Sequence, residues 1–310
     1  MILMDKREET IANIQAAVRK GTYNVKVEPD DPKLSQEQRQ ALRDKYLSLR
    51  PVEGKPTHKY SVNRRRARRI VNLATSMANR ETPVLGLEKT RGLERAIVTS
   101  NHFSPIDNTV VRKMVRQTGR KYMPVVANEE NLAMDGLFGF LMTYADTIPL
   151  AMSPEYVTHC FEPMLQQELE KGNFVLIYPE QEMWFNYRKP RPCKRGAYLY
   201  AARYDVPVLS CFVELHDKEE LQQPDFVDVS YVIHVLDPIY PDPALTPREN
   251  SFVMAEKDYQ QKVAAYEAAY GKKLNYRFEV EDIAGWVPTD KVRAQVEAMW
   301  ASEADELCVA

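Results

Sequence analysis

The residues best suited to chemistry in this sequence are a histidine and an aspartate five positions apart, His102 and Asp107. Between them, Ser104 suits the N-cap of a helix and Pro105 the first helical position, which places Asp107 on the first turn. His102 is then expected in the preceding loop, where the carboxylate holds one imidazole nitrogen and the other can accept a proton. The pattern indicates a general base. The alternative is a plain capping box beside an incidental histidine.

The elements that must position this pair follow an α/β pattern. From about Pro83, short β-rich runs alternate with helical segments, which predicts a mixed, largely parallel sheet flanked by helices. Seven strands are expected, over residues 83–89, 95–100, 121–127, 146–150, 173–178, 206–214 and 227–236. Helices are expected after Ser104 and over residues 136–144, 154–171 and 196–204. The catalytic pair would lie where the second strand gives way to a helix.

An N-terminal helical region is expected over residues 1–80. Its first helix places Ile11, Ile14 and Val18 on one face, and Ser35 with Gln38 opens the second. The third has an apolar stripe opposite a polar one. The apolar stripe comprises Ala67, Ile70, Val71, Ala74 and Met77, and the polar stripe comprises Arg65, Arg68, Arg69 and Asn72.

Two more helices are expected near the C-terminus. One starts at the capping box of Thr246 and Glu249, and the other starts near Asp290. We therefore divide the chain into the N-terminal helical region, an α/β core over residues 81–240 and a C-terminal helical extension over residues 241–310. Membrane docking or packing on the core is expected of the N-terminal region.

Four ordered segments resemble the sequence blocks of one enzyme family. They are Asn101-His102-x-Ser104-Pro105-x-Asp107, Tyr178-Pro179-Glu180, Lys194-Arg195-Gly196-Ala197 and Val206-Pro207-Val208. Their residues and their order resemble those of the sequence blocks in the bacterial glycerol-3-phosphate and 1-acylglycerol-3-phosphate (lysophosphatidate) acyltransferases. The resemblance implies transfer of a fatty acyl group from acyl-CoA or acyl carrier protein to a hydroxyl of a lysophospholipid or related lipid. It also implies that His102 deprotonates this hydroxyl and that Asp107 orients His102.

The blocks and a neighbouring basic loop supply candidate residues for binding the acceptor or the donor. The blocks contribute Asn101, Ser104, Glu180 and Gly196, and the loop contributes Arg188, Lys194 and Arg195. The loop also holds Lys189 and Arg191, and guanidinium groups bind phosphate bidentately. The alternatives are a solvated loop and, for Glu180, a carboxylate that caps backbone amides.

The chain departs from the family pattern where a phosphate would bind. Gln181-Glu182-Met183 stands where the family usually has Gly, then Thr or Ser, then Arg, and Met152 stands at or near another expected arginine. A glycolipid or another hydroxylated lipid is therefore an alternative acceptor. Aromatic residues in the same stretch line an acyl or headgroup pocket or belong to the core. These are Trp184, Phe185 and Tyr187.

Composition sets limits on partners and cofactors. The 42 Lys and Arg residues nearly balance 44 Asp and Glu, so no general attraction to nucleic acid is expected. The four cysteines form no Cys-x-x-Cys pair and have no metal-ligand spacing to histidine, so we expect free thiols and no metal. No bound cofactor is expected beside the co-substrate, acyl-CoA or acyl carrier protein.

The sequence also predicts where the protein acts. The longest mainly apolar stretch, residues 136–145, is about half of the roughly 20 residues that span a bilayer. We therefore expect a cytoplasmic protein, peripheral at the inner face of the membrane where its lipid acceptor lies. The arginine cluster over residues 64–69 either contacts an anionic membrane surface or forms a solvated face.

Two other functions fit the same fold. One is an acyl-thioester hydrolase, in which water replaces the acceptor. The other is a non-catalytic protein that binds lipid or acyl carrier protein. A binding module needs neither His102 nor Asp107, so the presence of both favours the enzyme.

Overall fold

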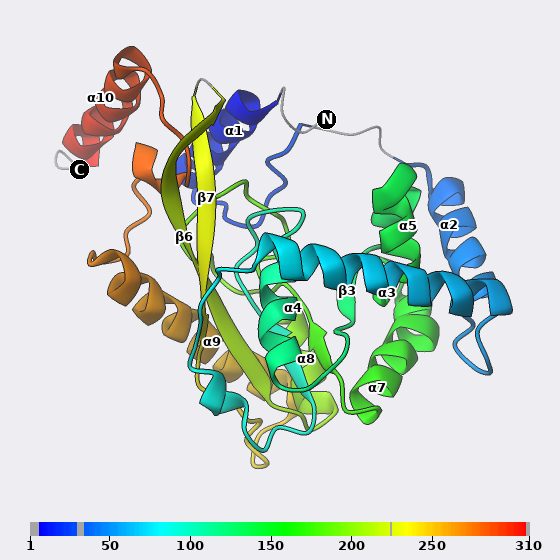
Figure 1. Cartoon of the computed structure of the whole chain (residues 1–310). Coiled ribbons are helices and arrows are strands. Elements are labelled where there is room, and N and C mark those ends of the chain that lie inside the picture. Colours follow the sequence, from blue (N-terminus) through cyan, green and yellow to red (C-terminus); the bar gives the residue numbers. More distant parts are fainter. Residues whose placement is uncertain (1–5, 30–33, 224, 308–310) are drawn as a thin grey trace.

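One seven-stranded sheet organises the protein. The computed structural model describes residues 6–29, 34–223 and 225–307 (Figure 1). The strands are β1 (Val84–Leu85), β2 (Ala96–Thr99), β3 (Val125–Asn128), β4 (Thr147–Leu150), β5 (Phe174–Leu176), β6 (Val208–Gln223) and β7 (Phe226–Val235). The predicted α/β class and its mixed, largely parallel sheet are confirmed.

The strand order brings the loops after β2 and β5 together. Across the sheet the order is β1-β7-β6-β2-β5-β3-β4, and only the β6–β7 pair is antiparallel. Strands β1 and β7 therefore run opposite to the other five. Since β2 and β5 are parallel neighbours, the chain leaves both at the same edge, where ligands bind in open α/β sheets.

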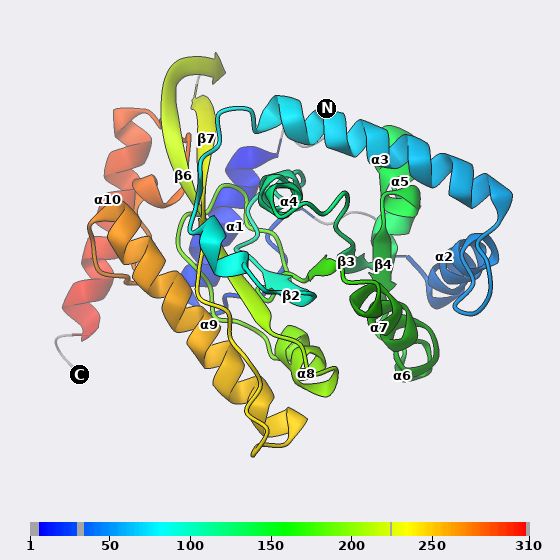
Figure 2. The ribbon, with the colours of Figure 1, turned by 60° about the horizontal axis from the view of Figure 1, so that its bottom comes forward.

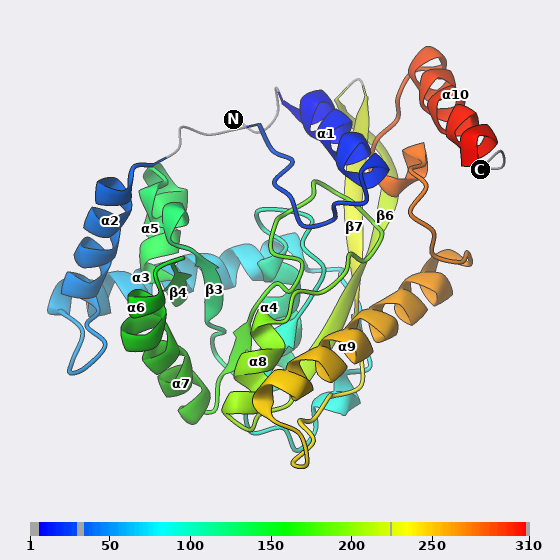
Figure 3. The same cartoon turned by 180° about the vertical axis from the view of Figure 1, so that it is seen from behind.

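Helices lie on both faces of the sheet and at its periphery. The helices are α1 (Arg7–Arg19), α2 (Gln36–Leu49), α3 (His58–Ala78), α4 (Asn108–Gln117), α5 (Gly136–Tyr144), α6 (Pro154–Tyr156), α7 (Glu162–Glu170), α8 (Gly196–Arg203), α9 (Pro247–Tyr270) and α10 (Asp290–Leu307). Shorter helical turns are η1 (Leu87–Thr90), η2 (Glu129–Ala133), η3 (Val157–Phe161) and η4 (Val280–Asp282). Helix α4 lies on one face of the sheet, and α8 and α9 lie on the other (Figures 1 and 3).

Central strand β2 is buried on both sides, which fixes the start of the loop that holds His102 and Asp107. Ile97 packs into the core that contains Ala197 of α8, whereas Val98 packs into the core that contains Val110 and Met114 of α4. Successive side chains of a strand point to opposite faces, so a strand covered on both faces needs apolar residues throughout. This explains why the stretch Ala96–Thr99 shows no polar alternation.

The terminal regions follow the prediction in part. Ile11, Ile14 and Val18 of α1 are buried, and the predicted capping boxes open α2 and α9. Strand β6 is longer than predicted, because residues 215–223 continue the pairing with β7. Cys160, Cys193 and Cys211 are free, and Cys308 lies outside the described residues.

Helix α3 is rotated relative to the predicted apolar stripe. Ala67 and Val71 are buried, but Ile70 is 37% exposed and Met77 is 71% exposed. The buried face instead follows Tyr60, which packs edge-on against Tyr46. Among the described residues, no helix is long and apolar enough to cross a membrane.

Candidate active site

His102 and Asp107 meet at the carboxyl end of β2. Nδ1 of His102 lies 2.7 Å from Oδ2 of Asp107. The imidazole is 20% exposed, whereas the carboxylate is only 2% exposed. Because the carboxylate holds Nδ1, Nε2 is the nitrogen that can accept a proton from a bound molecule. The geometry matches the predicted pair of a base and its orienting carboxylate.

The backbone of the same loop fixes Asp107. Oδ2 accepts hydrogen bonds from the N–H groups of Phe103 at 2.9 Å and Ser104 at 3.2 Å. The predicted helix start is therefore wrong: α4 begins at Asn108, and residues 104–107 form a turn closed by the Asp107 N–H and the Ser104 carbonyl at 3.1 Å. The carboxylate satisfies two N–H groups ahead of the helix, which favours the turn over an earlier helical start.

Tyr178, from the loop after β5, contacts both His102 and Asp107. Its ring stacks on the His102 ring with centroids 3.9 Å apart and an interplanar angle of 12°. Its hydroxyl donates to Oδ1 of Asp107 at 2.5 Å. Burial, followed by the charge of Asp107, raises the pKa of Tyr178 well above its ordinary value, so the hydroxyl remains a donor. Sequence reasoning missed this role.

A buried ion pair supports the backbone of His102. Glu180 and Arg191 are each 1% exposed, with Nη2 of Arg191 2.8 Å from Oε2 of Glu180. The same Oε2 accepts from the His102 N–H at 3.1 Å, and Nη2 donates to the His102 carbonyl at 3.3 Å. The backbone N–H of Arg191 donates to Oε1 at 2.9 Å. Glu180 thus positions the loop, in contrast to the predicted substrate contact.

Carboxylates neutralise most of the predicted basic loop. Nζ of Lys189 lies 2.7 Å from Oδ2 of Asp282 in a pair whose side chains are each 1% exposed. Arg188 pairs with Asp217, and its side chain is 12% exposed. Together with Arg191, three of the five cations are therefore engaged within the protein. The structure does not support the predicted phosphate contact of Arg188, since its charge already has a partner.

Lys194 and Arg195 are the exposed cations of this loop. The Lys194 N–H donates to the Pro179 carbonyl at 2.8 Å, which keeps its backbone next to Glu180. The Arg195 guanidinium lies 3.9 Å from the ring centroid of Phe252. These two residues remain candidates for binding an anionic group.

The other predicted binding residues have mainly structural surroundings. The Asn101 amide exchanges two hydrogen bonds with the Val213 backbone, at 2.9 and 2.8 Å, so it ties the loop that holds His102 to β6. The Ser104 hydroxyl accepts from the Ile106 N–H at 3.4 Å. Gly196 is exposed at the start of α8, with open space where a Cβ would lie. Trp184 and Tyr187 are buried core residues packed with α1.

The N-terminal segment approaches the site from outside the predicted core. The Tyr23 carbonyl accepts from Nη1 of Arg191 at 3.0 Å, and the Val25 carbonyl accepts from Nε1 of Trp184 at 2.9 Å. Farther along, Glu28 lies within electrostatic range of His102, and burial raises the pKa of Glu28. Oε1 of Glu28 is buried without a hydrogen-bond partner in the described structure. Sequence reasoning did not place this carboxylate near the pair.

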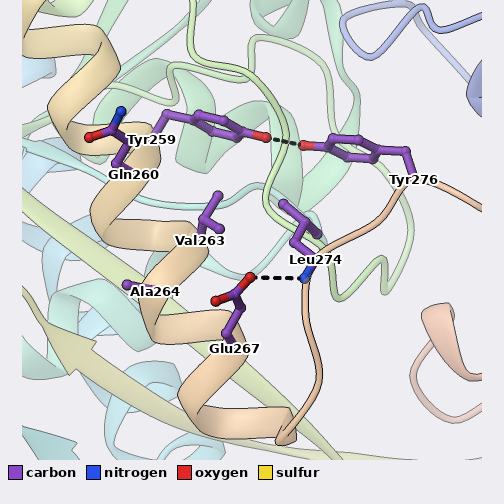
Figure 4. Close-up of a pocket in the computed structure, with 7 residues that line it drawn as sticks. All are labelled: Tyr259, Gln260, Val263, Ala264, Glu267, Leu274 and Tyr276. Atoms are coloured by element: carbon purple, nitrogen blue, oxygen red, sulfur yellow. Dashed lines mark hydrogen bonds between the residues drawn. The ribbon is translucent and has the colours of Figure 1, made fainter.

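A hollow of about 400 Å³ lies apart from the catalytic pair, against α9 (Figure 4). Its lining includes Val263, Leu274 and two tyrosines whose hydroxyls are 2.7 Å apart, Tyr259 and Tyr276. The Tyr276 hydroxyl donates to the Pro190 carbonyl at 2.7 Å, which joins this wall to the basic loop. His102 and Asp107 do not line this hollow.

Comparison with known proteins identifies the central segment. Residues 81–214 match the model of the family described as Acyltransferase. Among solved structures, the chain is similar to PlsC, the 1-acyl-sn-glycerophosphate (LPA) acyltransferase from Thermotoga maritima. The two are 15% identical, the match covers 88% of this chain and 100% of that chain, and the TM-score is 0.46. No curated protein matches the chain.

Proposed function

We propose, from the match of residues 81–214 to the acyltransferase family, that the protein transfers a fatty acyl group from a thioester to a lipid hydroxyl. The acceptor is a lysophospholipid or a related lipid, and the donor is acyl-CoA or acyl carrier protein. The observation that carries the proposal is the His102–Asp107 pair, 2.7 Å apart, within the matched segment. Its base faces the sheet edge where ligands bind.

The geometry supports a direct transfer. Nε2 of His102 takes the proton of the acceptor hydroxyl as the oxygen attacks the thioester carbonyl. The C–O bond forms, the C–S bond breaks, and the protonated imidazole returns its proton to the departing thiolate. Asp107 holds the ring in one tautomer and stabilises the imidazolium that forms in between. A thioester is already activated, so placing the alcohol beside the base supplies much of the rate.

The cysteines support a mechanism without an acyl-enzyme. Burial raises the pKa of both the Cys193 and Cys211 thiols to about 12, and it also raises the pKa of Cys160. A thiol, unlike a thiolate, is a weak nucleophile, so these three residues are poorly suited to accept the acyl group at neutral pH.

The charged groups around His102 and Asp107 bear on which acceptor headgroup is favoured. Lys194 and Arg195 are exposed near Glu180, whereas Met152, where the family pattern has an arginine, is 90% exposed and uncharged. Glu28 adds a buried carboxylate oxygen that has no hydrogen-bond partner among the described residues. A hydroxyl-rich or amine-bearing headgroup would supply the hydrogen-bond donors that this carboxylate lacks. Glycolipid and amine-bearing acceptors therefore belong in the test beside lysophosphatidate.

The test is mass spectrometry of products after the purified protein is mixed with an acyl thioester and a panel of lipids. The panel contains lysophosphatidate, a monoacylglycerol, a glycolipid and a lysophosphatidylethanolamine, and each is offered with acyl-CoA and with acyl carrier protein. We expect one acceptor to gain an acyl group with release of free thiol. Fatty acid released at the same rate without any acceptor would indicate a hydrolase. An intact thioester in every reaction would indicate a binding protein.

Replacing Tyr178 by phenylalanine should change how the transfer rate depends on pH. The variant keeps the ring that stacks on His102 but removes the hydrogen bond to Asp107. Asp107 then stabilises the protonated imidazole more strongly, so a higher pH is needed for the neutral base. We expect the acid limb of the kcat/KM profile to move up by about 0.5 to 1 pH unit, or roughly 0.7–1.4 kcal/mol.

The other charged groups near the pair are the same in this variant. Glu180 and Arg191 flank the His102 backbone, and Glu28 approaches from the N-terminal segment. The matched control is Tyr240→Phe, which removes a hydroxyl from a tyrosine that is 61% exposed. A Tyr178→Phe profile that overlays the wild-type profile would exclude this role.

A further inference from the structure

The segment that follows α1 runs back to the candidate active site. Helix α1 lies against the β6–β7 pair (Figures 2 and 3), with Ile14 and Phe226 in one apolar cluster. The chain leaves the helix at Gly21, which adopts a φ of 64°, and continues over residues 22–29, which we call the N-terminal strap. The strap lies outside the segment that matches the acyltransferase family. Any part that it plays in the site is therefore additional to the matched segment.

Two hydrogen bonds tie the strap to the groups that hold the His102 backbone. The Tyr23 carbonyl accepts from Nη1 of Arg191, and the Val25 carbonyl accepts from Nε1 of Trp184. The same two residues donate to the His102 carbonyl, Arg191 through Nη2 at 3.3 Å and Trp184 through its backbone N–H at 3.1 Å. The strap and the His102 backbone therefore share their anchors.

Glu28 is the carboxylate that the strap brings to the site. Val27, which precedes it, is 1% exposed and packs in the same apolar cluster as Trp184. Glu28 is half-buried and lies within electrostatic range of His102. Its Oε1 is buried and has no hydrogen-bond partner among the described residues. A buried carboxylate oxygen is costly unless it is hydrogen-bonded, so a bound molecule that donates to Oε1 is favoured.

Two other carboxylates near His102 are already engaged. Both oxygens of Asp107 have partners within the protein, and so do both oxygens of Glu180. The buried cation Arg191 is paired with Glu180. Unlike Asp107 and Glu180, Glu28 therefore keeps an oxygen for a bound molecule.

The charges around Glu28 favour a cation there. Burial raises the pKa of the Glu28 carboxyl, and the charge of Glu182 adds to this rise. Lys26 acts in the opposite direction, but it is exposed, so solvent screens its charge. Met183, where the family pattern has an arginine, brings no charge. A cationic group beside Glu28 would offset the repulsion between the two carboxylates, whereas a phosphate would add to it.

We propose that Glu28 is a specificity-determining residue, whose carboxylate binds a primary ammonium group on the acceptor headgroup and repels a phosphate monoester. This inference rests on the proposed function, since it names the class of lipid whose hydroxyl His102 would deprotonate. An ammonium supplies both N–H donors for Oε1 and the positive charge that Glu28 and Glu182 favour. A sugar hydroxyl supplies only the donor, and a phosphate monoester adds negative charge. Repulsion of the wrong ligand is a common source of specificity.

The experiment compares kcat/KM for lysophosphatidylethanolamine, for its N-acetylated form, which lacks the ammonium, and for lysophosphatidate. We expect the wild type to prefer the first acceptor to both others. Glu28→Gln should lower the preference for the ammonium form over the N-acetyl form by about 10- to 100-fold, the usual contribution of a hydrogen bond between charged groups. The change should appear mainly in KM, because the contact is made before the reaction. Glu28→Lys should reverse the order and make lysophosphatidate the better acceptor.

The matched control is Glu53→Gln, which neutralises an exposed carboxylate between α2 and α3 and should keep the wild-type preference. Glu28→Gln should unfold at the wild-type temperature, because Oε1 has no hydrogen bond to lose. An unchanged preference in both Glu28 variants would overturn the role of Glu28, and the transfer itself would still support the proposed function.

Calorimetric binding of short-chain, water-soluble forms of the three lipids tests Glu28 without turnover. A wild type that binds the ammonium form about tenfold more tightly than the N-acetyl form, but transfers nothing from either donor, would support Glu28 and reject the proposed transfer. A wild type that transfers an acyl group but binds the three lipids equally, or binds lysophosphatidate best, would reject the role of Glu28 alone. Neither binding nor transfer would reject both.

Discussion

Replacing His102 by alanine is expected to lower kcat/KM for acyl transfer by about 10²–10⁴-fold, the usual contribution of a general base. The imidazole is the group that can take the acceptor proton, because Asp107 holds its Nδ1 and leaves Nε2 for the substrate. Thioester and acceptor would still bind, so KM should change much less than kcat. The measurement is steady-state kinetics with the acceptor that the lipid panel identifies.

Folding should survive this substitution. The His102 side chain is 20% exposed, and Asp107 keeps its hydrogen bonds from Phe103, Ser104 and Tyr178 when the ring is removed. His216→Ala is the matched control, since that imidazole is 48% exposed and pairs with Glu214 on β6. Full activity in His102→Ala would show that another group accepts the proton. A lower unfolding temperature in His102→Ala would instead indicate that activity is lost because the fold is destabilised.

The local part of the site was predictable because its residues are close in sequence. His102 and Asp107 lie in one loop, so their meeting depends only on the turn after β2. The partners Tyr178 and Arg191 come from 71 and 89 residues farther along the chain. Their contacts exist because β2 and β5 are neighbours in the sheet, and the linear pattern does not specify that order.

The errors also arose from distant partners. From the sequence alone, the basic loop was predicted to bind phosphate. Asp217 and Asp282 neutralise Arg188 and Lys189, but they lie 29 and 93 residues farther along the chain. The rotation of α3 has the same origin. The apolar residues of α3 are compatible with more than one buried face, and the packing of Tyr60 on Tyr46 determines which face is buried. Strand positions were predicted better, since burial on both faces leaves a continuous apolar run.

Replacing Arg191 by methionine should destabilise the protein strongly, by about 3–5 kcal/mol, because a buried carboxylate would lose its cation. Glu180 is 1% exposed and accepts two side-chain hydrogen bonds from Arg191, at 3.1 and 2.8 Å. Arg191 also donates to the carbonyls of Tyr23 and His102, which would be left with fewer partners. Denaturant unfolding measures the free-energy difference directly.

Two comparisons separate the lost ion pair from lost packing. Arg203→Met removes the partner of Glu162 in a pair whose arginine side chain is 41% exposed, and it should cost no more than about 1 kcal/mol. Glu180→Gln combined with Arg191→Met removes both charges, so it should recover part of the stability lost by Arg191→Met alone. If Arg191→Met has the same free energy of unfolding as Arg203→Met, the buried pair is not what holds the His102 loop. If the double variant is stable but slow, the pair acts by positioning His102, since the chain still folds while the base loses its backbone support.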